Sequence, residues 1–545
     1  MAESPGALGV SDTLVTCMPA VCLRHTEIPN TTKLFADFTQ HFDRLARFYR
    51  HDPWSPGALR RAAEAAAAAY PDARRQALVA ALREQNGPSP ALETLAQPGS
   101  VAIVTGQQVG LFGGPCYTIY KALTAVRYAE ALTAQGIPAV PIFWLASEDH
   151  DFAEVNHAWC FNGEHQPVRF EVSTPGTGTR PVGGLVIDEY PVKLLRQVLS
   201  AFPHGEEIVA LVEQSYQDGT TLGAAFCKLL RRLLPDRGLL YLCPQYPAIR
   251  EIAAPLIEQA IQSAPGLSDL LLQRNNELAQ AGYHAQVHFE AKTSLFFLLD
   301  RGERIALRRD GDTYAANGSR YSSEDLSKRA ASISPNALLR PVVQDYLLPT
   351  AALIGGPAEL AYLAQTEVIY RSLGLPMPLV APRAGFTLLD ARAAKLLTRY
   401  QLTLTDTFDG LEPLRENMAA CLVPPGMRQQ LETAQASVAS KMEALIGGLS
   451  GFDPTLGAAA SKSRDKILFQ LAKIESKTAR ESFRRDARAR SDAAFLHSLL
   501  YYDKHLQERF YTILPFLAQH GGLALIDQIY ENVKLECPDH VVLTV

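Results

Sequence analysis

Acidic and histidine side chains crowd the end of one short apolar run, in the segment FWLASEDHDFAEVNH (143–157). Adjacent charged groups are costly to bury without partners, so this run needs water, a cation or a substrate amine beside it. His150 is suited to general acid–base chemistry, and we predict His150, Asp149 and Asp151 as catalytic residues and Glu148 as substrate-binding. The alternatives are a metal ion, and a solvated helix start capped by Asp149 or Asp151. The spacing matches no standard metal motif, so no metal ligand is predicted.

A glycine-rich stretch, VTGQQVGLFGGPCYTIYK (104–121), comes about forty residues earlier. Glycine lets the backbone turn sharply or approach a ligand closely, and a helix start binds anions through free N–H groups. Neither the P-loop pattern GxxxxGK[ST] nor GxGxxG is present. A tight turn is the alternative to a polar binding loop. The predicted substrate-binding residues here are Thr105, Gly106, Gln107, Gln108, Gly113, Gly114, Tyr117 and Lys121.

A third cluster lies in LLRPVVQDYLLPTAALIGGPAELAY (338–362), which repeats the GGP of 113–115. An arginine such as Arg340 can bind a carboxylate through two parallel hydrogen bonds, and an internal Arg–Asp ion pair is the alternative. Arg383, at the end of LVAPR, is a candidate of the same kind. The predicted substrate-binding residues of this part are Arg340, Gln344, Asp345, Gly356, Glu359 and Arg383.

The elements that must position these residues alternate between strand and helix. The apolar runs VAIVTG, VPIFWLAS and GLLYLCP have the length of buried strands, and the helical pattern TIYKALTAVRYAEALTAQG separates the first two. This spacing indicates a βαβ unit of a parallel sheet, whose ligands bind at the carboxyl ends of the strands. Both opening clusters fall at such ends, so the sequence predicts one site at that edge of the sheet.

Two regions interrupt the alternation and predict antiparallel strands: PVRFEVS with GGLVIDEY, and AQVHFEAKTSLFFLLDRGERIALRR. We interpret them as insertions, at about 155–235 and 285–335, in a core that spans residues 1–390 and is completed by residues 506–545. The N-terminal part is helical in pattern, and KLFADFTQHFDRLARFYR (33–50) places its leucines and phenylalanines on one face.

Residues 391–505 are predicted to form an antiparallel coiled coil. Leu431, Val438 and Leu445 recur every seven residues, Ile467 with Ile474 and Leu471 with Thr478 continue the pattern, and SGFDPTLG (450–457) supplies the turn. The pattern is too short for a fibre and suits an arm or a dimerisation hairpin.

Composition narrows the class of protein. The 545 residues carry a net charge of −5 and no basic domain, which argues against a nucleic-acid partner. No long apolar run and no secretion signal is present, so no membrane partner and a cytoplasmic location are expected. The eight cysteines are scattered without a CxxC pair, which is typical of reduced thiols rather than a zinc module.

Taken together, several motifs in this order resemble the family of the bacillithiol biosynthesis cysteine-adding enzyme. They are VTGQQVGLFGGPCYTIYKA, WLASEDHDFAEVNH, LRPVVQDYLLPT, GGPAELAY, LGLPMPLVAPR and LQERFYTILPFL, and the resemblance runs from about residue 100 to the C-terminus. It implies an α/β fold: a Rossmann-like parallel-sheet core akin to class I aminoacyl-tRNA synthetases, with connecting-peptide insertions. It also implies an α-helical coiled coil that supports a homodimer.

The resemblance further implies a ligase that joins L-cysteine to glucosaminyl-malate by an amide bond, in the last step of bacillithiol biosynthesis. We expect the 105–121 loop to hold an activating phosphate or the malyl carboxylate, and Arg340 or Arg383 to clamp that carboxylate. Asp149, His150 and Asp151 would orient and deprotonate the sugar amine. ATP with Mg²⁺ is the expected activating reagent, with no tightly bound cofactor.

Two other classes of protein stay open at this point. One is a nucleotidyl- or aminoacyl-transferase that has the same core and acts on another small amine acceptor. The other is a coiled-coil interaction protein with a degenerate core, which predicts a closed or apolar pocket at the strand ends.

Overall fold

The computed structural model describes residues 21–173, 178–187, 190–311 and 313–545. The first 20 residues of the predicted core, with Cys17 among them, lie outside the described residues. The remaining seven cysteines are free thiols. Within the described ranges, no helix is both long and apolar enough to cross a bilayer.

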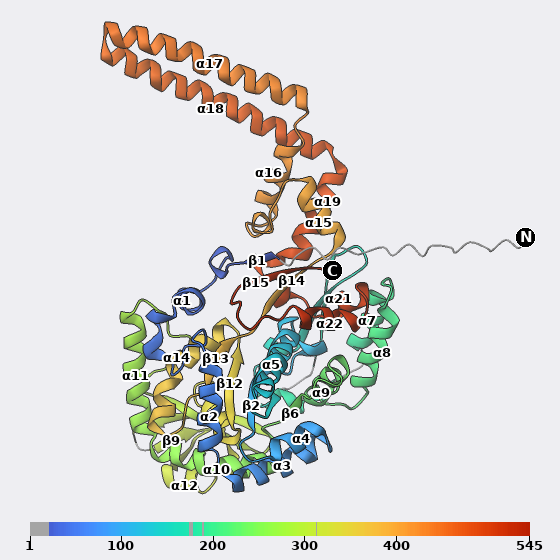
Figure 1. Ribbon diagram of the computed structural model, residues 1–545, viewed down its shortest axis with the longest axis vertical. Coiled ribbons are helices and arrows are strands. Elements are labelled where there is room, and N and C mark those ends of the chain that lie inside the picture. The colour runs from blue at the N-terminus through green and yellow to red at the C-terminus, as the bar shows by residue number, and fades with distance from the viewer. Residues whose placement is uncertain (1–20, 174–177, 188–189, 312) are drawn as a thin grey trace, which may run out of the picture.

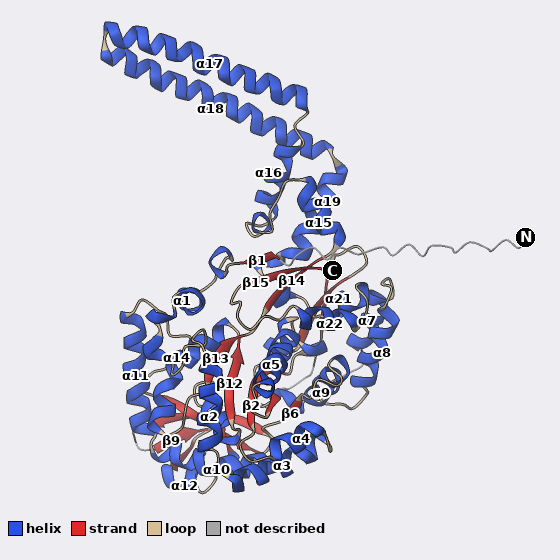
Figure 2. Ribbon diagram, in the orientation of Figure 1, coloured by secondary structure: helices blue, strands red, loops and turns tan. Residues whose placement is uncertain are grey.

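A five-stranded parallel sheet forms the centre of the globular body, as predicted (Figure 2). Every neighbouring pair in it is parallel, in the order β13-β12-β2-β3-β6. Numbered by position along the chain, this is the order 5-4-1-2-3 of a Rossmann-like sheet. The strands are β2 (Val101–Gln108), β3 (Ala139–Ala146), β6 (Leu240–Leu242), β12 (Thr350–Gly355) and β13 (Leu379–Pro382).

Helices cover both faces of this sheet because alternate side chains of each strand point to opposite sides. Val101 and Ile103 pack with α2 and α5, where alanines of α2 allow close approach, whereas Ala102 and Val104 face α10, α13 and α14. These helices are α2 (Ala58–Ala69), α5 (Tyr117–Ala134), α10 (Pro247–Gln262), α13 (Arg340–Leu347) and α14 (Pro357–Ser372).

The strand order reverses at β2, whose two neighbours are reached by connections that run in opposite directions. One crossover, through α5, leads to β3, and the chain returns much later to β12 on the other side of β2. At such a switch point the loops diverge and leave a crevice at the carboxyl ends of the strands. The topology therefore places any ligand beside the ends of β2 and β12.

The first predicted insertion is mostly helical. Its hairpin pairs β4 (His157–Phe161) with β5 (Pro167–Glu171), and α7 (Tyr190–Leu199), α8 (Gly205–Ser215) and α9 (Leu222–Leu233) follow. The strand expected in GGLVIDEY is wrong: residues 182–184 form a 3₁₀ turn and Val186 makes only an isolated bridge to Thr221. Residues 188–189 of that motif lie outside the described residues.

The second insertion is an antiparallel sheet, as predicted, and follows α11 (Ala264–Gln280). Its order is β10-β9-β8-β7-β11. The strands are β7 (Thr293–Asp300), β8 (Glu303–Asp310), β9 (Thr313–Ala316), β10 (Ser319–Ser322) and β11 (Ile333–Pro335).

The pattern of residues 33–50 correctly predicts which side chains are buried, but the segment does not form one continuous helix. The apolar face of 33–50 is buried, yet α1 (Lys33–Gln40) ends at His41 and two 3₁₀ turns replace the rest. Thr32 caps the start of α1 by accepting from the Phe35 N–H. Helices α3 (Asp72–Asn86) and α4 (Pro90–Ala96) lead into β2.

The C-terminal segment returns to the core through a third sheet, which the sequence did not predict. Strand β15 (His540–Thr544) lies between β1 (Val21–Leu23), which is antiparallel to it, and β14 (Gly385–Leu389), which is parallel. Helices α20 (Gln507–Phe510), α21 (Leu514–Gln519) and α22 (Ala524–Glu531) precede β15 and pack on the body.

An antiparallel helical hairpin projects far from the body, as Figure 1 shows. Helices α17 (Pro425–Phe452) and α18 (Pro454–Arg485) meet at Asp453, which caps α18 within the predicted turn. The hairpin is joined to the body through α15 (Ala391–Arg399), α16 (Leu411–Cys421) and α19 (Ala487–Leu500). The fold is thus a Rossmann-like core with an α-helical coiled coil, while the exact division at residues 391 and 505 stays a prediction.

Only part of the predicted heptad pattern lies between the two helices. Leu431 and Val438 are half-buried against α18, and Leu471 and Thr478 are half-buried against α17. Other apolar side chains of the predicted pattern are exposed by 42–50%: Leu445, Ile467 and Ile474. A second apolar stripe therefore stays uncovered on a hairpin of only two helices.

Acid is expected to destabilise the fold through buried neutral histidines. Burial lowers the pKa of His25, beside His540, from 6.5 to about 4. Between these values the unfolded chain binds more protons than the folded one, so the free energy of unfolding falls as pH drops from about 6.5 to about 4. One such group contributes up to ~1.4 kcal/mol per pH unit. Urea unfolding of a His25→Asn variant between pH 7 and 4.5 should show a shallower decline than the native chain.

The exposed His288 provides the control for this series. A His288→Asn variant should keep the native pH dependence. Identical slopes for the native chain and His25→Asn would contradict the assignment.

Candidate active site

A cavity of about 350 Å³ opens at the carboxyl ends of β2 and β12, at the switch point of the sheet. It is half-open, and charged and polar side chains share its lining with apolar ones, unlike the closed or apolar pocket expected of a degenerate core. Of the predicted site residues, the cavity brings together Thr105, Gly106, Gln107, Gln108, Tyr117, Lys121, Asp149, Arg340, Gln344, Gly356, Glu359 and Arg383. The other six, described below, do not line it.

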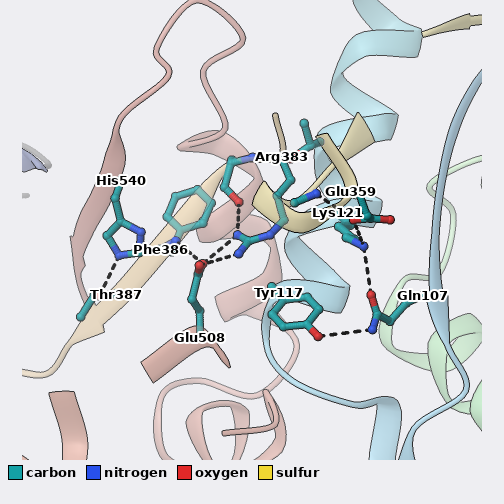
Figure 3. A network of polar contacts seen from close by, with 12 residues as sticks. Gln107, Tyr117, Lys121, Glu359, Arg383, Phe386, Thr387, Glu508 and His540 are labelled. Atoms are coloured by element: carbon teal, nitrogen blue, oxygen red, sulfur yellow. Dashed lines mark hydrogen bonds and ion pairs between the residues drawn. The ribbon is translucent and has the colours of Figure 1, made fainter. Parts of the chain in front are cut away.

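Lys121 organises the end of β2 rather than offering a free charge. Its Nζ donates to the Gly106 carbonyl and to Gln107 Oε1, both at 2.9 Å, and pairs with Glu359 Oε2 at 2.5 Å. An ammonium group has three N–H donors, so all three are used within the protein. Gln107 Nε2 in turn donates to the Tyr117 hydroxyl at 3.3 Å, and Figure 3 shows this chain of contacts.

Gly106 has a specific steric role in the same strand. It lies opposite Trp144 of β3, and a Cβ at Gly106 would approach the Trp144 carbonyl oxygen to 2.7 Å. The strand ends can therefore lie this close only with glycine here. On the other side of β2, the Thr105 hydroxyl donates to the Ile354 carbonyl at 3.0 Å, which links β2 to β12.

The second half of the glycine-rich loop faces away from the cavity. Gly113 and Gly114 have positive φ angles of 85° and 71°, which supports the tight turn, and neither lines the cavity. At the start of α5 the Cys116 N–H donates to the Tyr511 carbonyl at 2.8 Å. With Lys121 also saturated, these residues do not fit a nucleotide phosphate, and we derive no step that uses one here.

Asp149 is fixed at the cavity wall by three donors. Its carboxylate accepts from Gln108 Nε2 (3.1 Å), the His150 N–H (2.8 Å) and Arg304 Nη1 (3.4 Å). Burial alone would raise its pKa, but the charge of Arg304 and the two hydrogen bonds hold it below the usual value. Gln108 Nε2 also donates to Glu154 Oε2 at 2.8 Å, so two carboxylates face the same space.

The environment of His150 differs from that expected of a general base. Arg304 Nη1 lies 3.1 Å from His150 Nδ1. Arginine can only donate, so Nδ1 is the acceptor and the proton of the neutral ring is on Nε2. His150 lies outside the cavity lining, beside Phe297 at 5.7 Å between ring centroids.

Glu148 and Asp151 also lie outside the cavity. Glu148 is half-buried in an ion pair with Arg250 and accepts from the Ser334 hydroxyl at 2.7 Å. Asp151 is exposed and stands at the N-cap position of α6 (Phe152–Val155) without a capping hydrogen bond from its side chain.

Arg340 offers the cavity an uncompensated positive charge. Its guanidinium donates to the Tyr362 hydroxyl at 3.3 Å, and no carboxylate of the described residues lies within 4.0 Å of it. Burial lowers its pKa, but Tyr362, Glu359 and Asp149 together raise the value above the usual one, so the group stays charged. Gln344 lines the cavity beside it, whereas Asp345 points away and accepts from the Tyr370 hydroxyl at 2.5 Å.

Arg383, the other predicted clamp, is already occupied. It makes two hydrogen bonds to Glu508 of α20, at 2.8 and 2.5 Å, and donates to the Ala384 carbonyl at 2.9 Å. Both side chains of the pair are buried. Figure 3 shows Glu508 between Arg383 and the N–H of Phe386 on β14, to which it is also bonded at 3.1 Å. The internal ion pair, the alternative interpretation of this arginine, is the one observed.

Several residues of the cavity or its supports escaped the sequence analysis. Arg304 comes from β8 of the second insertion, where a single arginine on a strand carries no visible signal. Glu508 and Arg509 lie in LQERFY, a motif that was assigned to the core with residues 506–545 but not to the site. The cavity also includes Trp144, together with Glu154 and Tyr362 from the first and third clusters. Among the described residues, no group of three or more histidine, cysteine or acidic side chains has an arrangement that could hold a metal ion.

The fold and the cavity together define a Rossmann-like α/β protein with a ligand cavity at its switch point and an appended coiled coil. The model of the bacillithiol biosynthesis BshC N-terminal Rossmann-like domain matches residues 20–384, and that of the BshC C-terminal coiled-coil domain matches residues 386–545. The chain therefore belongs to the BshC family of bacillithiol biosynthesis.

Several similar proteins are named "Putative cysteine ligase BshC". One from Solibacter usitatus is 52% identical over 97% of this chain and 100% of its own. Those from Koribacter versatilis and Salinibacter ruber are 36% and 34% identical, over 96% and 94% of this chain and 99% and 96% of their own.

Proposed function

We propose that this protein is a cysteine ligase that joins the carboxyl group of L-cysteine to the amine of glucosaminyl-malate, in the last step of bacillithiol biosynthesis and in the cytoplasm. The observation that carries the proposal is the charge arrangement of the cavity: the unpaired Arg340 on one wall and the carboxylates of Asp149 and Glu154 on another. A substrate with both a carboxylate and an ammonium group is complementary to such a cavity.

Each wall has a distinct task in this proposal. Arg340, steadied by Tyr362, binds a malyl carboxylate through charge-assisted hydrogen bonds. Asp149, kept ionised by Arg304, accepts hydrogen bonds from the sugar ammonium and orients it toward the cysteine carboxyl. Holding the two reactants together in one cavity removes much of the entropic part of the barrier.

The direct test is coupling by the purified protein of glucosaminyl-malate and L-cysteine, followed by mass spectrometry with and without ATP and Mg²⁺. A product whose mass is the sum of both substrates less one water supports the proposal, and dependence on ATP and Mg²⁺ supports the expected activating reagent. An Asp149→Asn variant should couple at least about tenfold more slowly, since it loses the charge that holds the ammonium.

The same assay decides whether His150 takes the predicted catalytic part. Turnover of a His150→Ala variant within about threefold of the native chain would contradict that part. The competing transferase class is separated by thermal shift, because glucosaminyl-malate should raise the melting temperature of the ligase and not that of a transferase with another acceptor.

We further propose a homodimer that forms through the uncovered stripe of the hairpin. Six large apolar side chains that are more than 40% exposed lie, by their spacing, on one face of α17 or of α18, where a second hairpin would cover them: Met427, Leu445, Phe452, Leu456, Ile467 and Ile474. Light scattering coupled to gel filtration should give a dimer for the native chain. A Leu445→Glu, Ile474→Glu double variant should give a folded monomer, because charges in an apolar helix seam are strongly unfavourable.

The matched control for the dimer is Val186→Glu. Val186 is 52% exposed on the globular body, far along the chain from the hairpin, and its variant should stay dimeric. A native chain that elutes as a monomer at micromolar concentration would reject the proposal.

A further inference from the structure

The cavity contains more positive charge than its own acids neutralise. Two of its cations have carboxylate partners: Lys121 pairs with Glu359, and Arg383 pairs with Glu508. For the other two, no ion pair within 4.0 Å occurs among the described residues. The four cationic side chains of the lining are Lys121, Arg340, Arg383 and Arg509.

The two unpaired arginines come from different parts of the chain. Arg340 begins α13 and bonds to Tyr362 of α14. Arg509 belongs to α20, after the coiled coil, and is exposed at the mouth of the cavity. Arg509 lines the same cavity as Tyr117 of α5. Burial raises the pKa of the Tyr117 hydroxyl, and the charge of Arg509 opposes that rise. The two charges therefore reach the cavity from different elements, α13 and α20.

The neighbouring Glu508 anchors the segment that carries Arg509. Glu508 is almost fully buried, at 3% exposure, and is bonded to Arg383 and to the Phe386 N–H. Successive residues on a helix point about 100° apart, so Arg509 lies on a different face of α20 from Glu508. Its exposed side chain lines the cavity.

We propose that Arg509 is a specificity residue that binds a carboxylate of the substrate at the mouth of the cavity, while Arg340 binds a second carboxylate inside it. Two separated guanidinium groups are complementary to a ligand with two separated carboxylates, and each contact is charge-assisted. The inference rests on the proposed function, because the malyl group of glucosaminyl-malate is such a dicarboxylate. The inference goes beyond the proposed function because it assigns the selection of the malyl group to a side chain from the C-terminal segment.

The experiment is calorimetric binding, which does not depend on turnover. The probes are glucosaminyl-malate and methyl glucosaminide, which has the sugar amine and no carboxylate. An Arg509→Met variant should bind glucosaminyl-malate at least about tenfold more weakly, and methyl glucosaminide as the native chain does. Arg509→Lys, which keeps the charge, should recover part of the loss. Arg301→Met is the matched control, since that side chain is 93% exposed in the β7–β8 turn, and it should bind as the native chain does.

The outcomes separate the inference from the proposed function. Equal affinity of native and Arg509→Met proteins for glucosaminyl-malate overturns the role of Arg509. The role of Arg509 is also overturned if the variant binds both probes more weakly by the same factor, since the contact is then not with a carboxylate. Tenfold weaker binding in the variant, with no coupling by the native chain, supports the role of Arg509 and rejects the ligase. A native chain that binds neither probe overturns both.

Discussion

Replacing Glu508 with alanine should lower the free energy of unfolding by about 3–5 kcal/mol, the largest effect on stability expected for a single side chain here. The variant leaves the Arg383 guanidinium buried without its counter-charge and the Phe386 N–H without its acceptor. Among the described residues, Arg383 then keeps one hydrogen-bond acceptor, the Ala384 carbonyl, besides its contact with the Tyr117 ring at 5.1 Å from the centroid. An uncompensated buried cation costs far more than the loss of an exposed ion pair.

Urea unfolding followed by tryptophan fluorescence measures this loss, because all three tryptophans lie in the globular body, at positions 54, 144 and 159. The matched control is Glu416→Ala, which breaks the ion pair with Arg480, where both side chains are more than half exposed. That control should cost less than about 1 kcal/mol. Equal losses for the two variants would show that the buried pair contributes no more than a surface pair.

Replacing Arg340 with methionine should lower kcat/KM for glucosaminyl-malate by about 100-fold or more, the largest effect on activity expected for a binding residue. Hydrogen bonds to charged groups are worth ~1.5–3 kcal/mol each, and a guanidinium can give a carboxylate two of them. Methionine keeps much of the apolar stem, so the fold should hold. Tyr362→Phe should have a smaller effect, since it removes only the hydroxyl that steadies the guanidinium.

Initial rates over a range of glucosaminyl-malate concentrations, at saturating cysteine, give this result. The decrease in kcat/KM should come mainly from a higher KM if Arg340 binds the substrate equally strongly in the ground state and in the transition state. Arg371→Met is the control, since that arginine lies on α14 with a side chain 66% exposed. A kcat/KM within threefold of the native value for Arg340→Met would reject the carboxylate-binding role.

Much of the fold could be predicted because its signals are local. Apolar runs of strand length that end in polar or turn residues identified three strands of the parallel sheet: β2, β3 and β6. Since parallel strands bring their carboxyl ends to one edge, the clusters around Gln107 and Asp149 were expected to meet, and they do.

The predictions that were wrong concern features that depend on tertiary contacts, which a local sequence pattern does not reveal. The apolar face of 33–50 is buried as predicted, but His41, with φ −144° and ψ 54°, leaves the helical conformation, and 3₁₀ turns replace the rest of the expected helix. In the hairpin, the seven-residue repeat alone does not say which apolar positions face the partner helix. In the structure, Leu471 and Thr478 are half-buried, whereas Ile467 and Ile474 are exposed.

The sequence by itself determined the Rossmann-like core, the coiled coil and the polar character of the strand ends, because these follow from side-chain periodicity and from residue type. Only the tertiary structure decided which charges are free to meet a substrate. Arg383 and Lys121 match the pattern of ligand-binding cations as well as Arg340 does, yet each is neutralised by a partner more than 100 residues away: Glu508 for Arg383 and Glu359 for Lys121. Charge pairing acts across space rather than along the chain, so only the fold reveals Arg340 and Arg509 as the unpaired cations of the cavity.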